Sequence, residues 1–369
     1  MSPTNRTAVT ERPLSGTDKR SAQAPIISPD DRVLVTGASG FIGQKVVENL
    51  VRRGFREIRC LVRGQPAAIL QSLAATTDGT VSIVSGNLLS KDDCRRASAG
   101  VALVLHLAAA RGEKSFPDAF RNSVVTTRNL LDACGNTGHL RRFVNVSSFS
   151  VYIGASRRTR IVDESCAVEN NPSRRGEAYC YAKVKQDEIV EEYGRHFDIP
   201  YVIVRPGFVY GPGNEPISSR IGISTFGLFL HLGGNNALPF VYIDNCAEAI
   251  VLAGLTPDID REAFNVVDDD LPTSRQFLRL YKRNVKRFPS IYLPHIVSYL
   301  LCYLWESYAD WSQNQLPPVF NRTVWRAYWK QARYSNDKIK ARLGWQQKVT
   351  TSAALNSYFT SCRSVLRNA

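Results

Sequence analysis

The sequence predicts an α/β fold in which a parallel sheet is covered by helices on both faces. Short apolar runs that suit buried strands alternate with amphipathic segments that suit helices between Asp31 and Val204. Near-continuous apolar strands separated by helices are typical of parallel sheets. The first apolar run also leads directly into a glycine-rich turn, as in doubly wound, Rossmann-like folds. A smaller C-terminal substrate-binding part is expected to follow this sheet.

The positions of the elements follow from the spacing of apolar residues. Strands are expected at 33–35, 58–62, 81–85, 102–107, 143–147 and 201–204. Helices are expected at 41–51, 117–135, 179–196 and around 244–255. Because the alternation fades after Pro206, an NAD(P)-binding domain is placed at 29–205 and a mixed substrate-binding or lid region at 206–369. Some segments of the second region are expected to return to the first.

Residues 1–28 are expected to form a loose, disordered tail. They are rich in Ser, Thr, Pro, Arg and Ala and contain no apolar core that would offset the entropy of ordering. An organellar transit peptide would also be rich in arginine and serine, but Glu11 and Asp18 argue against that interpretation because such peptides contain few acidic residues. No secretory signal is visible in this stretch.

Composition excludes several classes of protein. A hydrophobic share of 44% and a charged share of 22% are ordinary for a globular chain, which excludes a disordered or fibrous class. The net charge of +14 comes from basic residues spread along the chain, without the compact basic run that indicates nucleic-acid binding. The eight cysteines and five histidines show none of the spacings of a metal site or a disulfide framework. A cytoplasmic protein with buried thiols and no metal is expected.

The segment 291–305, with the sequence IYLPHIVSYLLCYLW, is strongly apolar. It falls short of the roughly 20 residues that a membrane-spanning helix needs, and Pro294 and His295 interrupt it. No transmembrane segment is therefore expected. Two interpretations remain, of which a buried helix of the lid region is favoured over a helix that rests on a membrane surface or admits an apolar substrate.

The glycine turn is the first motif that carries chemistry. Its sequence, GASGFIG at 37–43, follows an expected strand and opens an expected helix. Gly37 permits the tight turn, Gly40 lets the backbone approach a pyrophosphate, and Gly43 lets the helix and strand pack closely. The free N–H groups and the positive dipole end of the helix favour a phosphate. Residues expected to contact a dinucleotide here are Gly37, Ser39, Gly40, Phe41, Ile42 and Gly43.

The residue after the second expected strand distinguishes NAD from NADP. An acidic side chain at this point accepts hydrogen bonds from the ribose of NAD, whereas this chain has Arg63. Because an arginine pairs with a 2′-phosphate, NADP is favoured over NAD as the cofactor. Further cofactor contacts are expected from residues at the ends of the third and fourth strands, namely Asn87, Leu88, Leu107, Ala108 and Ala109.

A tyrosine and a lysine four residues apart form the second motif. Tyr179 and Lys183 lie in an expected helix, where residues with this spacing share one face. A free tyrosine ionises near pH 10, but a nearby ammonium favours the tyrosinate and brings the pKa toward neutral pH. Tyr179 is therefore the expected acid and base of a hydride-transfer reaction. Lys183 is also expected to hold the ribose of the cofactor.

Serines at the end of the fifth expected strand complete the candidate active site. The carboxyl edge of a doubly wound sheet is where ligands of such folds bind. Ser148 is expected to donate a hydrogen bond to the substrate oxygen, and Ser147 is expected to lie nearer the nicotinamide. The candidate catalytic residues are thus Ser148, Tyr179 and Lys183.

These motifs together resemble the NAD-dependent epimerase/dehydratase family, the extended branch of the short-chain dehydrogenases and reductases. The resemblance runs from about Arg32 to Trp345. It includes RPGFVYGPG at 205–213, PFVYIDN at 239–245, YSNDK at 334–338 and LGW at 343–345. It implies a Rossmann fold, an NAD(P) cofactor with Pro206 among its contacts, and a homodimer.

The resemblance also bears on a second tyrosine and lysine pair, Tyr181 and Lys185, which has the same spacing as the first. Ala182 before Lys183, and Asp187 four residues after it, match the family pattern better. Tyr179 is therefore favoured over Tyr181 as the catalytic residue.

Several positions depart from the family pattern. Members that act as 4,6-dehydratases carry an Asp-Glu pair after the active-site hydroxyl, where this chain has Phe149 and Ser150, so dehydration is not expected. Phe208 and Leu238 stand where many nucleotide-sugar enzymes have polar residues that hold a diphosphate. A buried diphosphate without such donors is poorly compensated. Ser123 replaces a usual asparagine, so one supporting contact to the active site is expected to differ.

The resulting hypothesis is an NAD(P)-dependent oxidoreductase of a secondary alcohol or ketone, similar to the 3β-hydroxysteroid dehydrogenase and dihydroflavonol reductase side of the family. A relatively apolar small-molecule substrate is expected because the C-terminal third is rich in aromatic residues. The alternative is an NAD-dependent sugar or nucleotide-sugar epimerase that serves polysaccharide synthesis. A second alternative is a non-catalytic NAD(P)-binding subunit, against which the intact serine, tyrosine and lysine argue.

Overall fold

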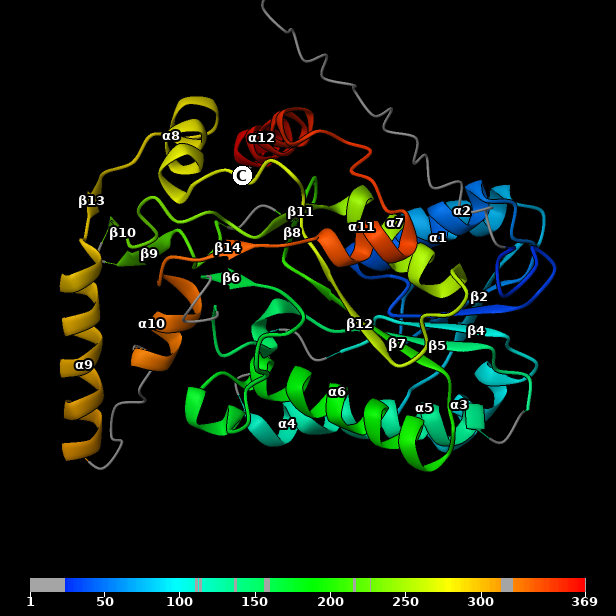
Figure 1. The fold of residues 1–369 in the computed structure, drawn as a ribbon. Helices are drawn as coiled ribbons and strands as arrows, with labels where there is room; N and C mark the ends of the chain where they lie inside the picture. The colour runs from blue at the N-terminus through cyan, green and yellow to red at the C-terminus, as the bar shows by residue number, and fades with distance from the viewer. Residues whose placement is uncertain are drawn as a thin grey trace, which may run out of the picture.

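A seven-stranded parallel sheet forms the centre of the molecule (Figure 1). Across the sheet the strands follow the order β12, β7, β5, β4, β1, β2 and β3. Their bounds are β1 Val33–Thr36, β2 Ile58–Val62, β3 Val81–Ser85, β4 Leu103–His106, β5 Arg142–Val146, β7 Tyr201–Pro206 and β12 Glu262–Val266. The chain changes direction across the sheet between β1 and β4, and such a switch point is where doubly wound folds bind ligands. This topology confirms the expected Rossmann-like fold.

The computed structural model describes residues 24–109, 112, 115–135, 138–155, 160–214, 217–225, 227–312 and 321–368. Most of the expected tail, 1–28, lies outside the described residues. Within it, residues 24–28 pack against the folded chain: the backbone amide of Ile26 donates to the carbonyl of Leu255 at 3.0 Å, and Ile27 is buried. This short stretch therefore belongs to the folded part of the chain.

Helices cover both faces of the sheet in two layers (Figure 1). The twelve helices that the structure describes are α1 Phe41–Arg52, α2 Ala68–Thr76, α3 Lys91–Ser98, α4 Phe116–Phe120, α5 Thr126–Gly135, α6 Ala178–His196, α7 Ile243–Leu255, α8 Ser274–Asn284, α9 His295–Trp311, α10 Arg322–Tyr328, α11 Asp337–Leu343 and α12 Thr351–Asn368. Apolar residues of α1, α7 and α11 pack on one face of the sheet, and those of α3, α5 and α6 pack on the other.

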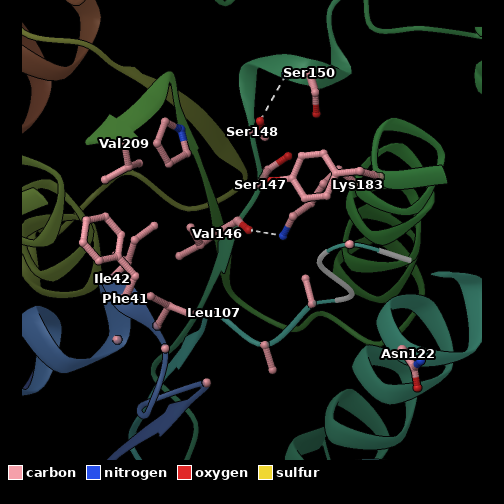
Figure 2. Close-up of a pocket in the computed structure, with 18 of the residues that line it drawn as sticks. Phe41, Ile42, Leu107, Asn122, Val146, Ser147, Ser148, Ser150, Lys183 and Val209 are labelled. Atoms are coloured by element: carbon pink, nitrogen blue, oxygen red, sulfur yellow. Dashed lines mark hydrogen bonds between the residues drawn. The ribbon is translucent and has the colours of Figure 1, made fainter. Parts of the chain in front are cut away.

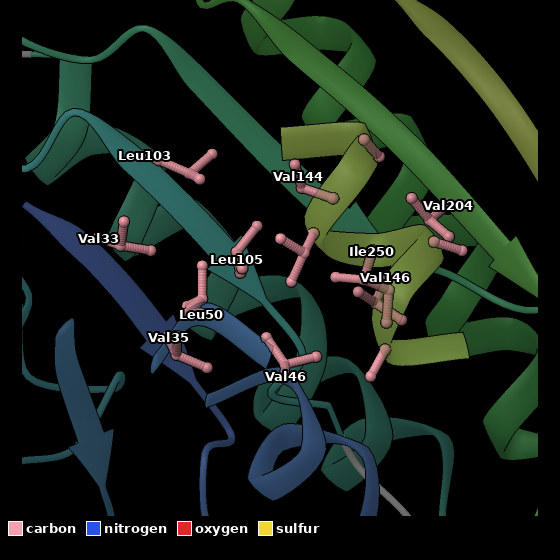
Figure 3. Packing of buried hydrophobic residues seen from close by; sticks show 14 of the residues in the cluster. Val33, Val35, Val46, Leu50, Leu103, Leu105, Val144, Val146, Val204 and Ile250 are labelled. Carbon is pink, nitrogen blue, oxygen red and sulfur yellow. The ribbon is translucent and has the colours of Figure 1, made fainter. Parts of the chain in front are cut away.

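The core between the sheet and the first helix layer consists of branched aliphatic side chains. Figure 3 shows Val46 and Leu50 of α1 and Ile250 of α7 among the valines and leucines of the central strands. These side chains are essentially inaccessible to water. Because the inner strands are buried on both faces, their sequences are mostly apolar, and the spacing of apolar residues therefore located six of the seven strands to within two residues at their ends.

The seventh strand, β12, comes from the region after Pro206 and pairs with β7. Helices α7 and α11 return to the sheet in the same way. The rest of that region forms a smaller part with an aromatic core and short sheets. Its strands are β8 Phe208–Tyr210, paired with β11 Phe240–Tyr242, and β9 Gly222–Thr225, β10 Leu228–His231 and β13 Ser290–Tyr292. A further pair joins β6 Ile161–Val162 to β14 Arg333–Tyr334.

Helix α9 contains most of the apolar segment 291–305, and its favoured interpretation as a buried helix is wrong. Its large apolar residues are exposed, with Ile296 84% and Trp311 79% accessible, whereas the buried positions are Ser298, Cys302 and Ala309. No helix in the described part of the chain combines the length and apolarity needed to cross a membrane.

The glycine turn brings α1 unusually close to β1. Gly37 has a φ of +70°, and a Cβ added to it would lie 2.9 Å from the backbone nitrogen of Ala108. A Cβ on Gly43 would overlap the carbonyl oxygen of Gly37. Backbone atoms on both sides of this contact leave no flexible group that can move away, so only glycine fits at either position.

His106, at the end of β4, joins three elements behind the sheet edge. Its Nδ1 lies 2.7 Å from Oγ1 of Thr36 on β1, and its Nε2 lies 2.8 Å from Oγ1 of Thr127 on α5. Gln186 of α6 reaches the same ring at 3.1 Å. Burial and, to a smaller extent, the nearby charge of Lys183 lower the pKa of His106 to about 3. The imidazole is therefore neutral at working pH and serves as a structural link.

Gly43→Ala should destabilise the protein by roughly 1–3 kcal/mol because the added methyl group overlaps backbone that cannot relax. Urea unfolding measures the expected loss of stability. Gly135→Ala is the matched control: its methyl group would lie 3.5 Å from Ile199, an ordinary contact. If both variants behave alike, the close approach of α1 to β1 has no special role.

His106→Gln should flatten the acid side of the stability profile. The folded protein keeps this ring neutral down to about pH 3, whereas the unfolded chain takes up a proton near pH 6.5. The free energy of unfolding should therefore fall by about 1.4 kcal/mol per pH unit below pH 6.5 through this one group, and the variant should lack that component. Urea unfolding at several pH values tests this, with the exposed His139→Gln as control; an unchanged slope in His106→Gln would contradict it.

Candidate active site

A pocket of about 750 Å³ opens at the carboxyl ends of β1, β4 and β5. Its volume lies within the range of small-molecule and cofactor sites. The residues that the sequence analysis assigned to catalysis or to the cofactor all line this pocket: Gly37, Ser39, Gly40, Phe41, Ile42, Gly43, Arg63, Asn87, Leu88, Leu107, Ala108, Ala109, Ser147, Ser148, Tyr179, Lys183 and Pro206. The fold thus brings together motifs that lie far apart in the sequence.

The start of α1 forms one wall of the pocket. Gly40 is the N-cap residue, no side chain caps the helix, and its first turn contains no acidic residue. The first N–H groups of a helix have no carbonyl partner within the helix, and the dipole adds positive potential there. This wall therefore suits the pyrophosphate of a dinucleotide, and Figure 2 shows Phe41 and Ile42 at the same side of the pocket as Leu107.

Two polar residues follow the neighbouring strands. Arg63 comes directly after β2 and is exposed where it lines the pocket. Asn87 follows β3 and is held by a turn in which its Oδ1 accepts from the amide of Leu89 at 3.0 Å. The backbone N–H of Asn87 donates to Oδ2 of Asp93 at 2.7 Å. Asn87 is thus held in a fixed orientation, whereas the guanidinium of Arg63 can adjust to a ligand.

Lys183 is buried on α6 with its ammonium directed at the end of β5. Nζ donates to the carbonyl of Val146 at 2.6 Å, as Figure 2 shows, and to Oε1 of Gln186 at 2.9 Å. Because an ammonium has three N–H groups, one remains for a ligand in the pocket. Burial lowers the pKa of Lys183 to about 8, and the charge of Asp187 opposes that shift. The side chain is therefore still charged at neutral pH.

Asp187, one turn after Lys183, ties α6 to two strands. Its carboxylate accepts from Oγ of Ser147 at 2.8 Å and from Nδ2 of Asn145 at 2.8 Å, both at the end of β5. Arg205 of β7 lies 3.3 Å from the same carboxylate. Burial raises the pKa of Asp187, and the guanidinium of Arg205 opposes the rise. These contacts fix the position of α6 against the sheet.

Ser148 presents its hydroxyl to the pocket in a defined way. Oγ accepts from the amide of Ser150 at 3.1 Å, the second dashed contact in Figure 2. A hydroxyl that already accepts a backbone N–H still has its own hydrogen to donate. Ser147 differs, because its hydrogen is used on Asp187. Ser148 is thus better suited than Ser147 to donate to a bound molecule.

The structure separates the two tyrosine and lysine pairs. Tyr179 is 39% exposed where it lines the pocket, and Lys183 lies one helical turn further along. Tyr181 instead packs edge-on against Phe116, with ring centroids 5.1 Å apart, and Lys185 forms a surface ion pair. The described lining of the pocket includes neither Tyr181 nor Lys185. The geometry therefore favours the first pair.

At the position of the usual asparagine this chain has Ser123, but the neighbouring Asn122 reaches the pocket instead. Residues Arg121–Val125 form a π-helical turn between α4 and α5. Within it Ser123 is fully buried, whereas its neighbour Asn122 lines the pocket (Figure 2). An amide is thus still presented, one residue earlier than the family pattern indicates. The sequence gives no local signal for a π turn, so Asn122 was missed.

The side of the pocket away from α1 is built by the smaller part of the chain and was also missed. Its residues include Phe208, Asn214, Ser218, Ser219, Arg220 and Tyr328. The guanidinium of Arg220 lies 4.7 Å from the ring centroid of Tyr328 and donates to the carbonyl of Ala327 at 3.0 Å. Of the two departures expected to remove diphosphate donors, Phe208 does line the pocket, whereas Leu238 is buried in the aromatic core. Arg220 places a positive charge in this wall of the pocket, which the sequence motifs did not predict.

Comparison with known proteins agrees with this architecture. The model of the NAD dependent epimerase/dehydratase family matches residues 33–266. A trifunctional UDP-glucose 4,6-dehydratase/UDP-4-keto-6-deoxy-D-glucose 3,5-epimerase/UDP-4-keto-L-rhamnose-reductase of Arabidopsis thaliana is 29% identical over 231 residues, which are 59% of this chain. A 3beta-hydroxysteroid-dehydrogenase/decarboxylase, isoform 2, of the same plant is 27% identical over 241 residues, 60% of this chain. The chain covers only 34% of the first relative and 40% of the second.

Solved structures resemble the fold over most of the chain. The structure of gox2253 has a TM-score of 0.72 at 22% identity and covers 92% of this chain and 99% of its own. A UDP-glucuronic acid 4-epimerase from Bacillus cereus in complex with NAD has a TM-score of 0.68 at 20% identity and covers 92% and 98% of the two chains. Since the family match extends over well over half of the sequence, this protein is an enzyme of the NAD-dependent epimerase/dehydratase family.

Proposed function

We propose that this protein transfers a hydride between NAD(P) and a secondary alcohol or ketone, with Tyr179 as the acid and base. The observation that carries the proposal is a single pocket that joins the uncapped start of α1 to Ser148, Tyr179 and Lys183. A dinucleotide whose pyrophosphate lies at the helix start extends along the switch point of the sheet toward the catalytic residues. When bound, the cofactor would donate or accept the hydride.

Each catalytic side chain then has one task. The hydroxyl of Ser148 donates a hydrogen bond to the substrate oxygen, which its bond from the amide of Ser150 leaves it able to do. Tyr179 takes the proton of the alcohol during oxidation and returns it during reduction. The ammonium of Lys183 stabilises the charge on the tyrosine oxygen and gives its remaining N–H to the ribose.

NADP is the cofactor we favour. Arg63 follows β2, lines the pocket and is exposed, so it can pair with a 2′-phosphate without breaking an existing buried contact. An exposed arginine also tolerates NAD, which is the cofactor of the Bacillus cereus structure that resembles this fold. The preference therefore depends on one side chain.

The substrate side of the pocket supports two substrate classes. Phe208, Val209 and Tyr328 suit a relatively apolar alcohol, in line with a relative that is a hydroxysteroid dehydrogenase. Arg220, also in this wall, favours an anionic group, as in the nucleotide sugars of the other relatives. Because of Arg220, a nucleotide-sugar epimerase is the second candidate function.

A spectroscopic comparison separates these two functions. A dehydrogenase changes the absorbance of NAD(P)H in proportion to product formed, whereas an epimerase oxidises and reduces its substrate in one cycle and shows no net change. Purified protein should therefore be assayed with ketones, secondary alcohols and nucleotide sugars while both the absorbance and the products are recorded. Product without any absorbance change would establish the epimerase and contradict net oxidoreduction.

Tyr179→Phe should lower turnover by roughly 10²–10⁴-fold because the acid and base is removed. Binding of NAD(P)H should stay close to that of the parent protein. The matched control is Tyr181→Phe, which removes the same atom from a neighbouring tyrosine that packs outside the pocket. Turnover is measured by initial rates, and cofactor binding by fluorescence titration. Full activity in Tyr179→Phe would instead support a non-catalytic cofactor-binding subunit.

Arg63→Asp should weaken binding of NADPH by roughly 10–100-fold, since a charge-assisted contact is lost and a repulsive charge is added. Binding of NADH should change much less. Arg195→Asp makes the same change in net charge at an exposed site outside the pocket and controls for long-range effects. Equal losses for NADPH and NADH in Arg63→Asp would remove the argument for the phosphate.

A further inference from the structure

An ordinary surface helix turns its large apolar residues toward the protein. In helix α9 these residues face outward instead, and small residues face the protein. The face toward the protein carries Ser298, Cys302 and Ala309, which are buried. The outer face carries large apolar and aromatic residues with 42% to 84% of their surface exposed, namely Ile296, Val297, Leu300, Leu301, Tyr303, Leu304, Tyr308 and Trp311. In soluble proteins the large apolar residues face the core, and contiguous exposed apolar surface marks an interaction site.

Specific contacts hold α9 in this orientation. Nε1 of Trp325 on α10 donates to Oγ of Ser298 at 2.9 Å. Arg322 of α10 pairs with Glu306 at 2.8 Å. In Figure 1, α10 lies on the inner side of α9, which runs along the left edge of the molecule. The outer face is therefore exposed because the inner face is fixed to the protein.

The segment that leads into α9 is basic. Between Leu271 and Trp305 the sequence contains six Lys and Arg residues and no Asp or Glu. Five of the six are exposed: Arg275, Arg279, Arg283, Lys286 and Arg287. The guanidinium of Arg275 lies 5.1 Å from the ring centroid of Tyr292, three residues before the start of α9, so this basic surface adjoins the segment that leads into the apolar face. On α9 itself Glu306 is paired with Arg322, and Asp310 is an exposed carboxylate near the end of the helix.

We propose that α9 lies on a membrane surface that contains anionic lipids. An apolar face inserts at the boundary of headgroups and acyl chains, and nearby Lys and Arg residues are attracted to anionic headgroups. Tyrosine and tryptophan, of which the outer face has several, suit this boundary because each ring has an apolar body and a polar tip. A second copy of the chain fits less well, since it would bring the same basic surface against this one.

The docking helix is connected to the pocket. Tyr328 lines the pocket and belongs to α10, the helix on which α9 packs. Docking through α9 would therefore hold the substrate side of the pocket near the lipid surface, because α10 joins the two. This docking does not depend on the proposed reaction, because the contacts that carry it lie outside the catalytic residues.

Flotation with lipid vesicles tests the proposal on the full chain. The protein is mixed at low ionic strength with vesicles of phosphatidylcholine alone or of phosphatidylcholine with phosphatidylserine. We expect it to float with the anionic vesicles and much less with the neutral ones. Leu300→Gln/Leu304→Gln should weaken binding by about 10-fold or more, and Arg279→Gln/Arg283→Gln should weaken it by roughly 30-fold.

The control is Ile69→Gln/Phe197→Gln, which removes two apolar residues of similar exposure elsewhere on the surface. Binding of NADPH and thermal unfolding should be unchanged in all variants, which separates a docking defect from a folding defect. The proposal is overturned if the parent protein ignores anionic vesicles, or if Leu300→Gln/Leu304→Gln still floats. It is also overturned if the protein ignores vesicles and its mass in sedimentation falls on Leu300→Gln/Leu304→Gln, since the face would then join two copies.

Discussion

The geometry of the active site depends on how α6 is docked on the end of β5. The helix brings two charges into the interior, and each is compensated by the strands beneath it: the ammonium of Lys183 by the carbonyl of Val146, and the carboxylate of Asp187 by Ser147 and Arg205. Buried charges are tolerated only with such partners, and removing one partner costs roughly 3–5 kcal/mol. Sliding or rotating α6 would break both sets of contacts together. Tyr179, one turn away, therefore stays at the pocket.

The second constraint acts on the opposite wall. The backbone contact between Gly37 and Gly43 sets the distance between α1 and β1. It therefore determines the direction of the N–H groups in the first turn of α1. Between these two walls the chain changes direction across the sheet, which leaves a crevice that no crossover helix fills. The cofactor half of the site is thus determined by backbone packing, and the catalytic half by buried polar contacts.

How much of this arrangement the sequence predicted depends on whether the signal is local. The strands before Pro206 alternate with helices and were located, whereas β12 was missed because it lies in the region where this alternation fades. The glycine turn is a contiguous motif, and its residues line the pocket as expected. Arg220 and Tyr328 come from distant segments that only the folded chain brings together, so no spacing rule points to them. Helix α9 was expected to be buried because its mean apolarity is high, yet the arrangement of its residues around the axis decides which face meets water.

The π-helical turn at Arg121–Val125 shows that helical winding can substitute for a change of residue. Such a turn accommodates one more residue than an α-helical turn, so every side chain within it is rotated relative to the usual register. That rotation brings Asn122 to the cavity and takes Ser123 into the interior. During divergence from a common ancestor, insertion or loss of a single residue at this point would therefore exchange an amide for a hydroxyl in the wall of the cavity, although neither side chain had mutated.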